Sequence, residues 1–130
     1  MAANGQLLAW LTCDGVHIDP MSGKHTLLGV FSNLRGVRFP IVHPRMFWFL
    51  SVTSVAAGKH ELSIHISLPL GDRKTLLRRP FESPGPVHRL NLINEIKNLR
   101  FDQPGDYAIE VEIDNETLLV TTLNVSQHQQ

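Results

Sequence analysis

Strict alternation of apolar and polar residues marks the segment His60-Glu61-Leu62-Ser63-Ile64-His65-Ile66-Ser67-Leu68. Successive side chains of a β-strand point to opposite faces, so the leucines and isoleucines share one face. The serines, Glu61 and His65 share the other face. The pattern predicts a half-buried strand.

The same alternation returns twice near the C-terminus. Apolar residues occupy nearly every second position of residues 107–113 and of residues 119–125. Between them lies Asp114-Asn115-Glu116, and Asp and Asn tolerate the left-handed backbone conformations of a tight connection. These features predict a β-hairpin over residues 106–125.

Composition marks the strands at the start of the chain. Residues 7–13 and 25–32 are rich in β-forming residues. The segments Asp14-Gly15, Asp19-Pro20 and Ser22-Gly23-Lys24 between them are turn formers. Together they predict two strands joined by a loop that begins directly after Cys13.

The most apolar stretch of the chain covers residues 45–55. A near-continuous apolar run is typical of a central strand that is covered on both faces. Ala57-Gly58 is expected to turn this strand into the alternating segment. Gly71-Asp72 then turns the chain into a shorter strand at residues 74–79.

Prolines limit the remaining strands. Pro69 and Pro80 mark places where ladder hydrogen bonding is expected to stop, because proline has no backbone N–H. Pro84-Gly85-Pro86 predicts a loop, followed by a strand at residues 87–93. Residues 94–99 fit either one helical turn or a continuation of a loop.

These elements predict an all-β fold. About eight strands without an amphipathic helix favour an antiparallel two-layer β-sandwich. The length of 130 residues suits one domain, and the hydrophobic fraction of 42% is enough for one core. We expect a single domain over residues 1–130, with an ordered core over about residues 6–126.

The segment Gly105-x-Tyr107 favours an immunoglobulin-like sandwich. It resembles the tyrosine corner, in which the hydroxyl of a tyrosine near the start of a strand bonds to the backbone upstream. An ordinary core tyrosine is the alternative. The Cys–Trp–Cys framework of antibody domains is missing, because Cys13 is the only cysteine.

Several short motifs together resemble an uncharacterised family of short, mostly bacterial proteins, over nearly the whole chain. The motifs are the strand that ends in Cys13-Asp14, Gly23-Lys24-His25-Thr26-Leu27-Leu28-Gly29-Val30-Phe31, Phe39-Pro40, Gly58-Lys59-His60 and Phe101-x-x-x-Gly105-x-Tyr107. The resemblance implies a compact β-sandwich in a cytoplasmic bacterial protein, without an assigned activity or functional residues. Leu28 and Leu70 depart from the family pattern, which should alter one turn without changing the fold.

Composition narrows the classes of function. Twelve basic residues balance twelve acidic ones, so no global charge attracts nucleic acid or an anionic membrane. The lone Cys13 excludes an internal disulfide and favours a reducing compartment. The N-terminus lacks a basic start, and the apolar run at residues 7–13 is too short for a signal peptide or a membrane span. We expect a cytoplasmic protein without membrane association or cofactor.

Cys13, Asp14 and His17 suggest a thiol nucleophile with a nearby base. However, Cys13 closes an apolar strand beside a carboxylate that would raise its pKa, whereas a reactive thiolate needs an electropositive setting. We interpret Cys13 as structural and expect no enzyme activity. An enzyme that uses Cys13 and His17 remains the minority alternative.

The histidines and aspartates do not show the spacing of a metal site. The histidines lack an H-x-x-x-H pattern and a neighbouring cysteine cluster. The aspartates of the predicted turns are dispersed, whereas calcium needs several oxygens that converge from one or two loops. We expect no metal, and a solvated or hydrogen-bonded role for each of His17, His25, His43, His60, His65, His88 and His128.

Charge is distributed unevenly along the chain. Residues 73–100 carry seven basic residues against two acids, and residues 102–116 carry six acids and no base. If the strands near Arg73 and Arg89 are neighbours, they present a basic face opposed by an acidic strand. Such a face suits electrostatic pairing with a partner, and simple solvation of both regions is the alternative.

The leading functional prediction is a non-enzymatic protein-interaction module of unknown pathway. It would bind a protein partner or a second copy through a sheet edge at residues 74–79 and a basic surface. The candidate contacts are Arg73, Lys74, Arg78, Arg79 and Arg89. The alternative is a sandwich that binds a small ligand or anion through Arg78, Arg79 and Arg89.

Nucleic-acid binding is not expected. Arg78-Arg79-Pro80-Phe81 joins basic and aromatic character, but binding of a single strand usually needs several stacking aromatics on an open face. Most aromatic residues instead fall in strands assigned to the core, namely Trp10, Phe31, Trp48 and Phe49.

Overall fold

The computed structural model describes residues 5–69 and 71–128. Two sequence features discussed above, the extreme N-terminus at residues 1–4 and Leu70, lie outside this range. The described chain forms nine strands: β1 (Gln6–Ile18), β2 (His25–Phe31), β3 (Asn33–Gly36), β4 (Ile41–Thr53), β5 (Gly58–Ser67), β6 (Arg73–Ser83), β7 (Leu90–Phe101), β8 (Gly105–Ile113) and β9 (Glu116–Gln127).

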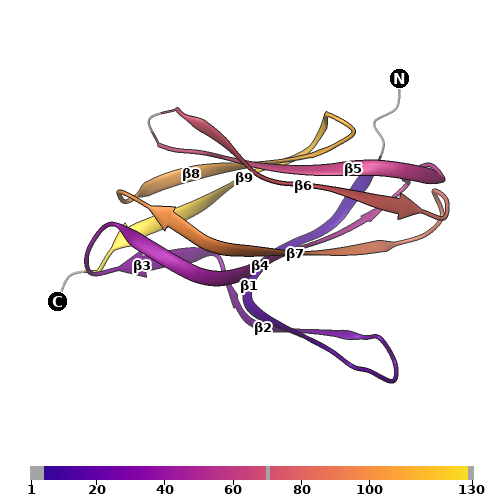
Figure 1. Cartoon of the computed structure of the whole chain (residues 1–130), viewed down its shortest axis with the longest axis horizontal. Helices are drawn as coiled ribbons and strands as arrows, with labels where there is room; N and C mark the ends of the chain where they lie inside the picture. Colours follow the sequence, from indigo (N-terminus) through magenta and orange to yellow (C-terminus); the bar gives the residue numbers. More distant parts are fainter. Residues whose placement is uncertain (1–4, 70, 129–130) are drawn as a thin grey trace.

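The strands form two packed sheets, which confirms the predicted β-sandwich (Figure 1). One sheet has the order β2-β1-β4-β7, and the other has the order β3-β9-β8-β5-β6. The pairs are antiparallel except for β3 and β9, which run parallel. β9-β8-β5-β6 follow strands G, F, C and C′ of variable-type immunoglobulin domains, and β4 beside β7 matches B beside E.

Alternating residues of both sheets meet in one core. The predicted alternation of β5 is confirmed, because Leu62, Ile64 and Ile66 are buried against the opposite sheet. β4 lies between β1 and β7, as expected for the most apolar stretch. The largest fully buried side chains are Trp48, Tyr107, Phe101, Met46, Leu50, Leu62, Ile64, Ile109, Ile113, Leu123, Val52 and Val55.

Tyr107 forms the predicted tyrosine corner. It lies near the start of β8, and its hydroxyl donates a hydrogen bond to the backbone carbonyl of Gln103 at 2.6 Å. Its ring meets Phe101 edge to face, with the centroids 5.0 Å apart. The hydroxyl thus has a hydrogen-bond partner although the side chain is buried.

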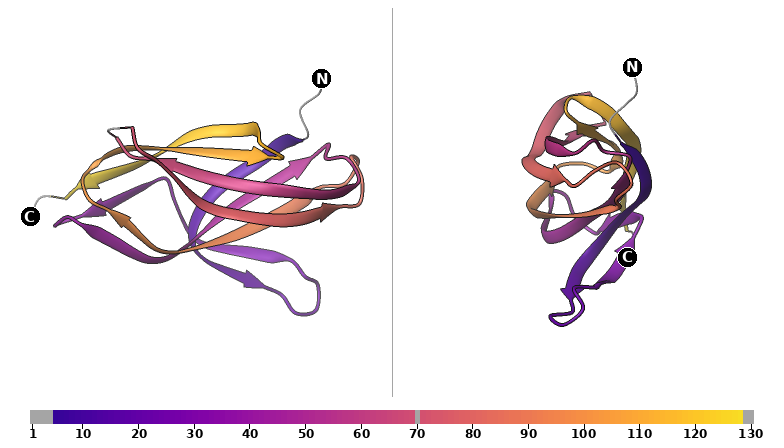
Figure 2. Two further views of the ribbon diagram at one scale, coloured as in Figure 1. Left: turned by 45° about the horizontal axis from the view of Figure 1, so that its top comes forward. Right: turned by 90° about the vertical axis from the view of Figure 1, so that its right-hand side faces the viewer.

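The predicted turn at Asp14-Gly15 is wrong, because β1 continues to Ile18 and pairs with β2 from Thr12 to its end. Opposite Asp14, Gly29 adopts a φ of 69°, and a Cβ there would lie 2.8 Å from the Asp14 carboxylate. Gly29 can adopt this left-handed conformation because it has no Cβ. The β1–β2 ladder continues past it, and no turn forms. The end of β1 and the start of β2 thus form an arm, residues 15–28, that projects from the sandwich (Figure 2).

Residues 94–99 form neither a helical turn nor a loop but the second half of β7. Asn98 takes a φ of 53°, a conformation that asparagine tolerates more readily than most residues. Val87 was predicted to begin this strand, yet it lies before β7 and is 88% exposed.

Pro80 does not end its strand as predicted, since β6 runs on to Ser83. β6 is an edge strand and has a neighbouring strand on one side only. The missing backbone N–H of a proline on the free side therefore costs no ladder hydrogen bond. The short strand β3 was not predicted at all. Its four residues carry no alternation that would be recognisable in isolation.

Candidate functional site

Arg73 and Arg78 lie on the outer face of the five-stranded sheet and pair with its acids. Arg73 Nη2 lies 3.2 Å from Glu110 Oε1 and 3.7 Å from Glu112 Oε2. Arg78 Nη1 lies 3.5 Å from Glu61 Oε1. The basic and acidic runs of the sequence therefore interleave on one face, where they offset each other.

The other three candidate contacts lie elsewhere. Arg79 spans from β6 to the opposite sheet, where Nη1 donates to the carbonyl of Ile93 at 2.8 Å and to Asn94 Oδ1 at 3.0 Å. Lys74 lines a hollow between β6 and β7. Arg89 lies beside the four-stranded sheet, near Ser51 and Asn91. The five residues thus do not converge on one surface.

His65 is the centre of a hydrogen-bonded cluster on the outer face of the five-stranded sheet. Its Nε2 lies 2.8 Å from Glu112 Oε1, and its Nδ1 lies 2.9 Å from Thr75 Oγ1. If Nε2 donates to the carboxylate, Nδ1 is left to accept the threonine hydroxyl. The sequence predicts a solvated or hydrogen-bonded His65 but does not identify these partners, which come from two other strands.

Cys13 has the properties of a structural cysteine. The side chain is fully buried, and its thiol donates to the carbonyl of Gly15 at 3.4 Å. Burial raises the pKa of the thiol, which disfavours the nucleophilic thiolate. His17 lies farther along β1, on the exposed arm.

His60 joins two loops through both of its ring nitrogens. Nδ1 lies 2.6 Å from Asp114 Oδ2, and Nε2 lies 2.7 Å from the carbonyl oxygen of Ala56. Only the imidazolium form can donate to both acceptors. The hydrogen bond that His60 donates to the Asp114 carboxylate raises the pKa of His60, and the bond to the Ala56 carbonyl adds to this, while burial opposes it.

The His60 contacts should make stability depend on pH. Because the folded pKa exceeds the unfolded value of 6.5, the stabilisation is fully present below pH 6.5 and is lost as pH rises through the folded pKa. Urea unfolding at several pH values is expected to show the largest deficit of His60→Gln near pH 5.5 and a smaller one near pH 8.5. His17→Gln, on the exposed arm, is the control, and an equal His60→Gln deficit at both pH values would contradict the assignment.

Two further properties concern metals and membranes. Among residues 5–69 and 71–128, no three His, Cys, Asp or Glu side chains are grouped so that they could hold a metal ion. Within the same residues, no helix is long and apolar enough to cross a membrane.

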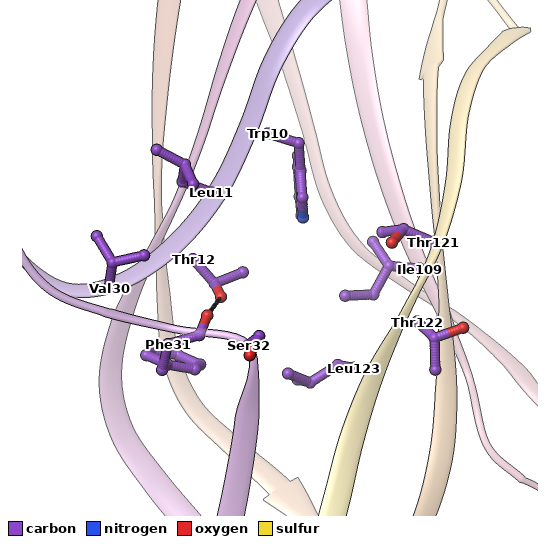
Figure 3. Close-up of a pocket in the computed structure, with 10 residues that line it drawn as sticks. All are labelled: Trp10, Leu11, Thr12, Val30, Phe31, Ser32, Ile109, Thr121, Thr122 and Leu123. Carbon is purple, nitrogen blue, oxygen red and sulfur yellow. Dashed lines mark hydrogen bonds between the residues drawn. The ribbon is translucent and has the colours of Figure 1, made fainter.

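A hollow lies in the seam between the two sheets, where β1 and β2 face β8 and β9 (Figure 3). It has a volume of about 270 Å³. Trp10 points into it from β1, and Ile109 and Leu123 approach from the other sheet. Its polar lining consists of uncharged hydroxyl side chains: Thr12, Ser32, Thr121 and Thr122.

Two strand edges without a ladder partner border this seam. β3 pairs only with Asn124–Gln127 of β9, so within the described chain no strand pairs with that edge of residues 118–123. On the opposite side, β2 pairs with β1 only from Thr12 onward, which leaves the preceding residues bonded to β4 alone. Each edge presents backbone donors and acceptors that another strand could use. No local pattern in the sequence indicates this seam, because it depends on where the short β3 docks.

Comparison with known proteins places the chain in a family. A family of unknown function (DUF6941) matches residues 8–126. No curated protein matches the sequence. The match extends from early in β1 to near the end of β9, so it includes both sheets and the seam between them. The chain therefore belongs to this family of unknown function.

Proposed function

We propose that the protein is a non-enzymatic interaction module of the bacterial cytoplasm that recruits a protein partner by strand addition along β9. The observation that carries the proposal is the edge of residues 118–123 without a ladder partner beside the seam. In strand addition, backbone hydrogen bonds supply affinity, and pockets for alternate side chains supply specificity. An added strand would continue the line of β3, with apolar side chains directed toward Trp10 and Leu123.

The edge of β6, which the sequence favoured, suits this role less well. β6 is an edge strand as expected. However, Pro80 lacks a backbone donor, and Arg79 reaches across to the carbonyl of Ile93 on β7. Both features hinder another strand from pairing with the second half of β6.

The alternative of an anion site at Arg78, Arg79 and Arg89 has weaker support. Arg78 already faces Glu61, and Arg79 is held by groups of β7. Arg89 lies just before β7, beside the other sheet. A common anion would require these three guanidinium groups to meet, so the geometry favours the interaction module.

Capture of partners by the native protein tests the proposal. A protein enriched by the wild type should be lost with the double variant Val120→Lys and Thr122→Lys, because lysines on an edge oppose strand addition. Both side chains are exposed, with Val120 at 64%. The same partner, once purified, should slow amide hydrogen exchange at residues 118–123.

Two control variants sharpen this experiment. Val87→Lys introduces a charge at another exposed position and should retain the partner. Arg78→Glu should also retain it. Loss with Arg78→Glu but not with the β9 variant would overturn the assigned edge, and no enrichment by the wild type would contradict the interaction module.

A further inference from the structure

A second candidate surface lies between the arm and the outer face of the four-stranded sheet, away from the β9 seam. The arm projects from the body of the sandwich (Figure 2), and residues of the arm and of this face line a common hollow. A hollow of about 510 Å³ separates Lys24, His25 and Leu27 of the arm from Phe49 and Asn91 of the sheet. Phe49 and Asn91 also line a second hollow of about 430 Å³, so the two hollows adjoin at these residues, and together they are called the groove.

The groove is suited to recognition through side chains. Phe49 belongs to β4, which is paired with β1 on one side and with β7 on the other, so its backbone is not available for strand addition. Leu27 and Phe49 instead provide apolar contacts on the two walls, and Leu8 extends the apolar surface into the second hollow.

The charge of the groove is one-sided. Its described lining includes Arg89, Lys24 and His25 but no carboxylate, and these three form no ion pair within the described chain. The acids nearby are engaged with other groups. Asp19 accepts bonds inside the turn of the arm, and Glu95 on the same sheet face pairs with Arg45 at 2.6 Å.

Ser51 is a buried polar residue at the base of the groove. It lines the groove on β4 beside Arg89 and Asn91, and the residue is only 5% exposed. Within the described chain its hydroxyl has no hydrogen-bond partner.

We propose that this groove binds a segment of another protein in which acidic residues alternate with large apolar ones. Its carboxylates would meet Arg89 and Lys24, and its apolar side chains would lie on Phe49 and Leu27. The extent and openness of the groove favour an extended segment over a compact metabolite. This site does not depend on strand addition at β9.

The test uses the full chain and a labelled short peptide of alternating glutamate and leucine, followed by fluorescence anisotropy. The double variant Arg89→Glu and Lys24→Glu should weaken binding about tenfold or more, as expected for reversal of charges at a complementary interface. Arg38→Glu, an exposed arginine outside the groove, is the matched control and should bind like the wild type. When the peptide is added to the wild type, the NMR chemical-shift changes should be concentrated at Phe49, Ser51 and Asn91.

Three results would overturn the proposal. One is equal binding by the wild type and the double variant, and another is equal binding of a glutamine–leucine peptide. The third is self-association in sedimentation experiments that Arg89→Glu abolishes, which would make a second copy the occupant. The β9 variant Val120→Lys with Thr122→Lys should bind the peptide normally, so failure at one site is distinguishable from failure at the other.

Discussion

Replacement of Trp48 by alanine is expected to lower the free energy of unfolding by about 3–5 kcal/mol, the usual cost of truncating a buried tryptophan. Trp48 is fully buried at the centre of β4. Its ring meets Trp10 with the centroids 5.8 Å apart, and its Nε1 donates to Met46 Sδ at 3.0 Å. Alanine would leave a cavity between the sheets that these neighbours fill only in part. Urea unfolding followed by circular dichroism measures the loss.

Val120→Ala is the matched control for this variant. Val120 belongs to β9 but is largely exposed, so its truncation should change stability by about 0.5 kcal/mol or less. Similar losses for the two variants would contradict the location of the core. A total stability of about 5–15 kcal/mol is typical of such domains, so Trp48→Ala could remove a large share of it.

Arg79→Met should destabilise the protein by about 2–3 kcal/mol, although Arg79 looks from the sequence like a surface contact. Its guanidinium links β6 to the carbonyl of Ile93 and to Asn94 Oδ1. Asn94 is buried and its Nδ2 donates in turn to the carbonyl of Trp48 at 3.0 Å. Methionine retains most of the apolar stem but leaves buried acceptors without their donor.

The neighbouring residue provides the comparison. Arg78→Met removes an exposed pair with Glu61 and is expected to cost about 1 kcal/mol or less. Chemical denaturation of the two variants in parallel separates the roles. If Arg78→Met proved the more damaging, the assignment of Arg79 as a link between the sheets would be wrong.

Arg78 and Arg79 also show which properties of a side chain can be predicted from the sequence and which cannot. Position along a strand predicts the face of a side chain, because the pleat has a period of two. Arg78 and Arg79 are adjacent and so diverge, one to the outer face and one toward the other sheet. What each arginine contacts depends on strands far away in sequence, and no local pattern records those neighbours.

The same distinction applies to the strands. Alternation in β5, β8 and β9 was sufficient to predict their existence and buried faces, and Gly105-x-Tyr107 predicted the tyrosine corner. The turn signal at Asp14-Gly15 misled, because Gly29 on the partner strand takes the left-handed conformation. A local turn preference is weaker than a ladder that continues for several residues on both sides.

The all-β class and the half-buried strands thus follow from the chain's own periodicity and turn residues, which act over a few neighbouring residues. Both candidate binding surfaces arise differently. The seam exists because β3 covers only the end of β9, and the groove exists because the arm lies beside the outer sheet face. Each requires segments distant in sequence to meet, so it depends on the packing of the whole sandwich and not on any local pattern.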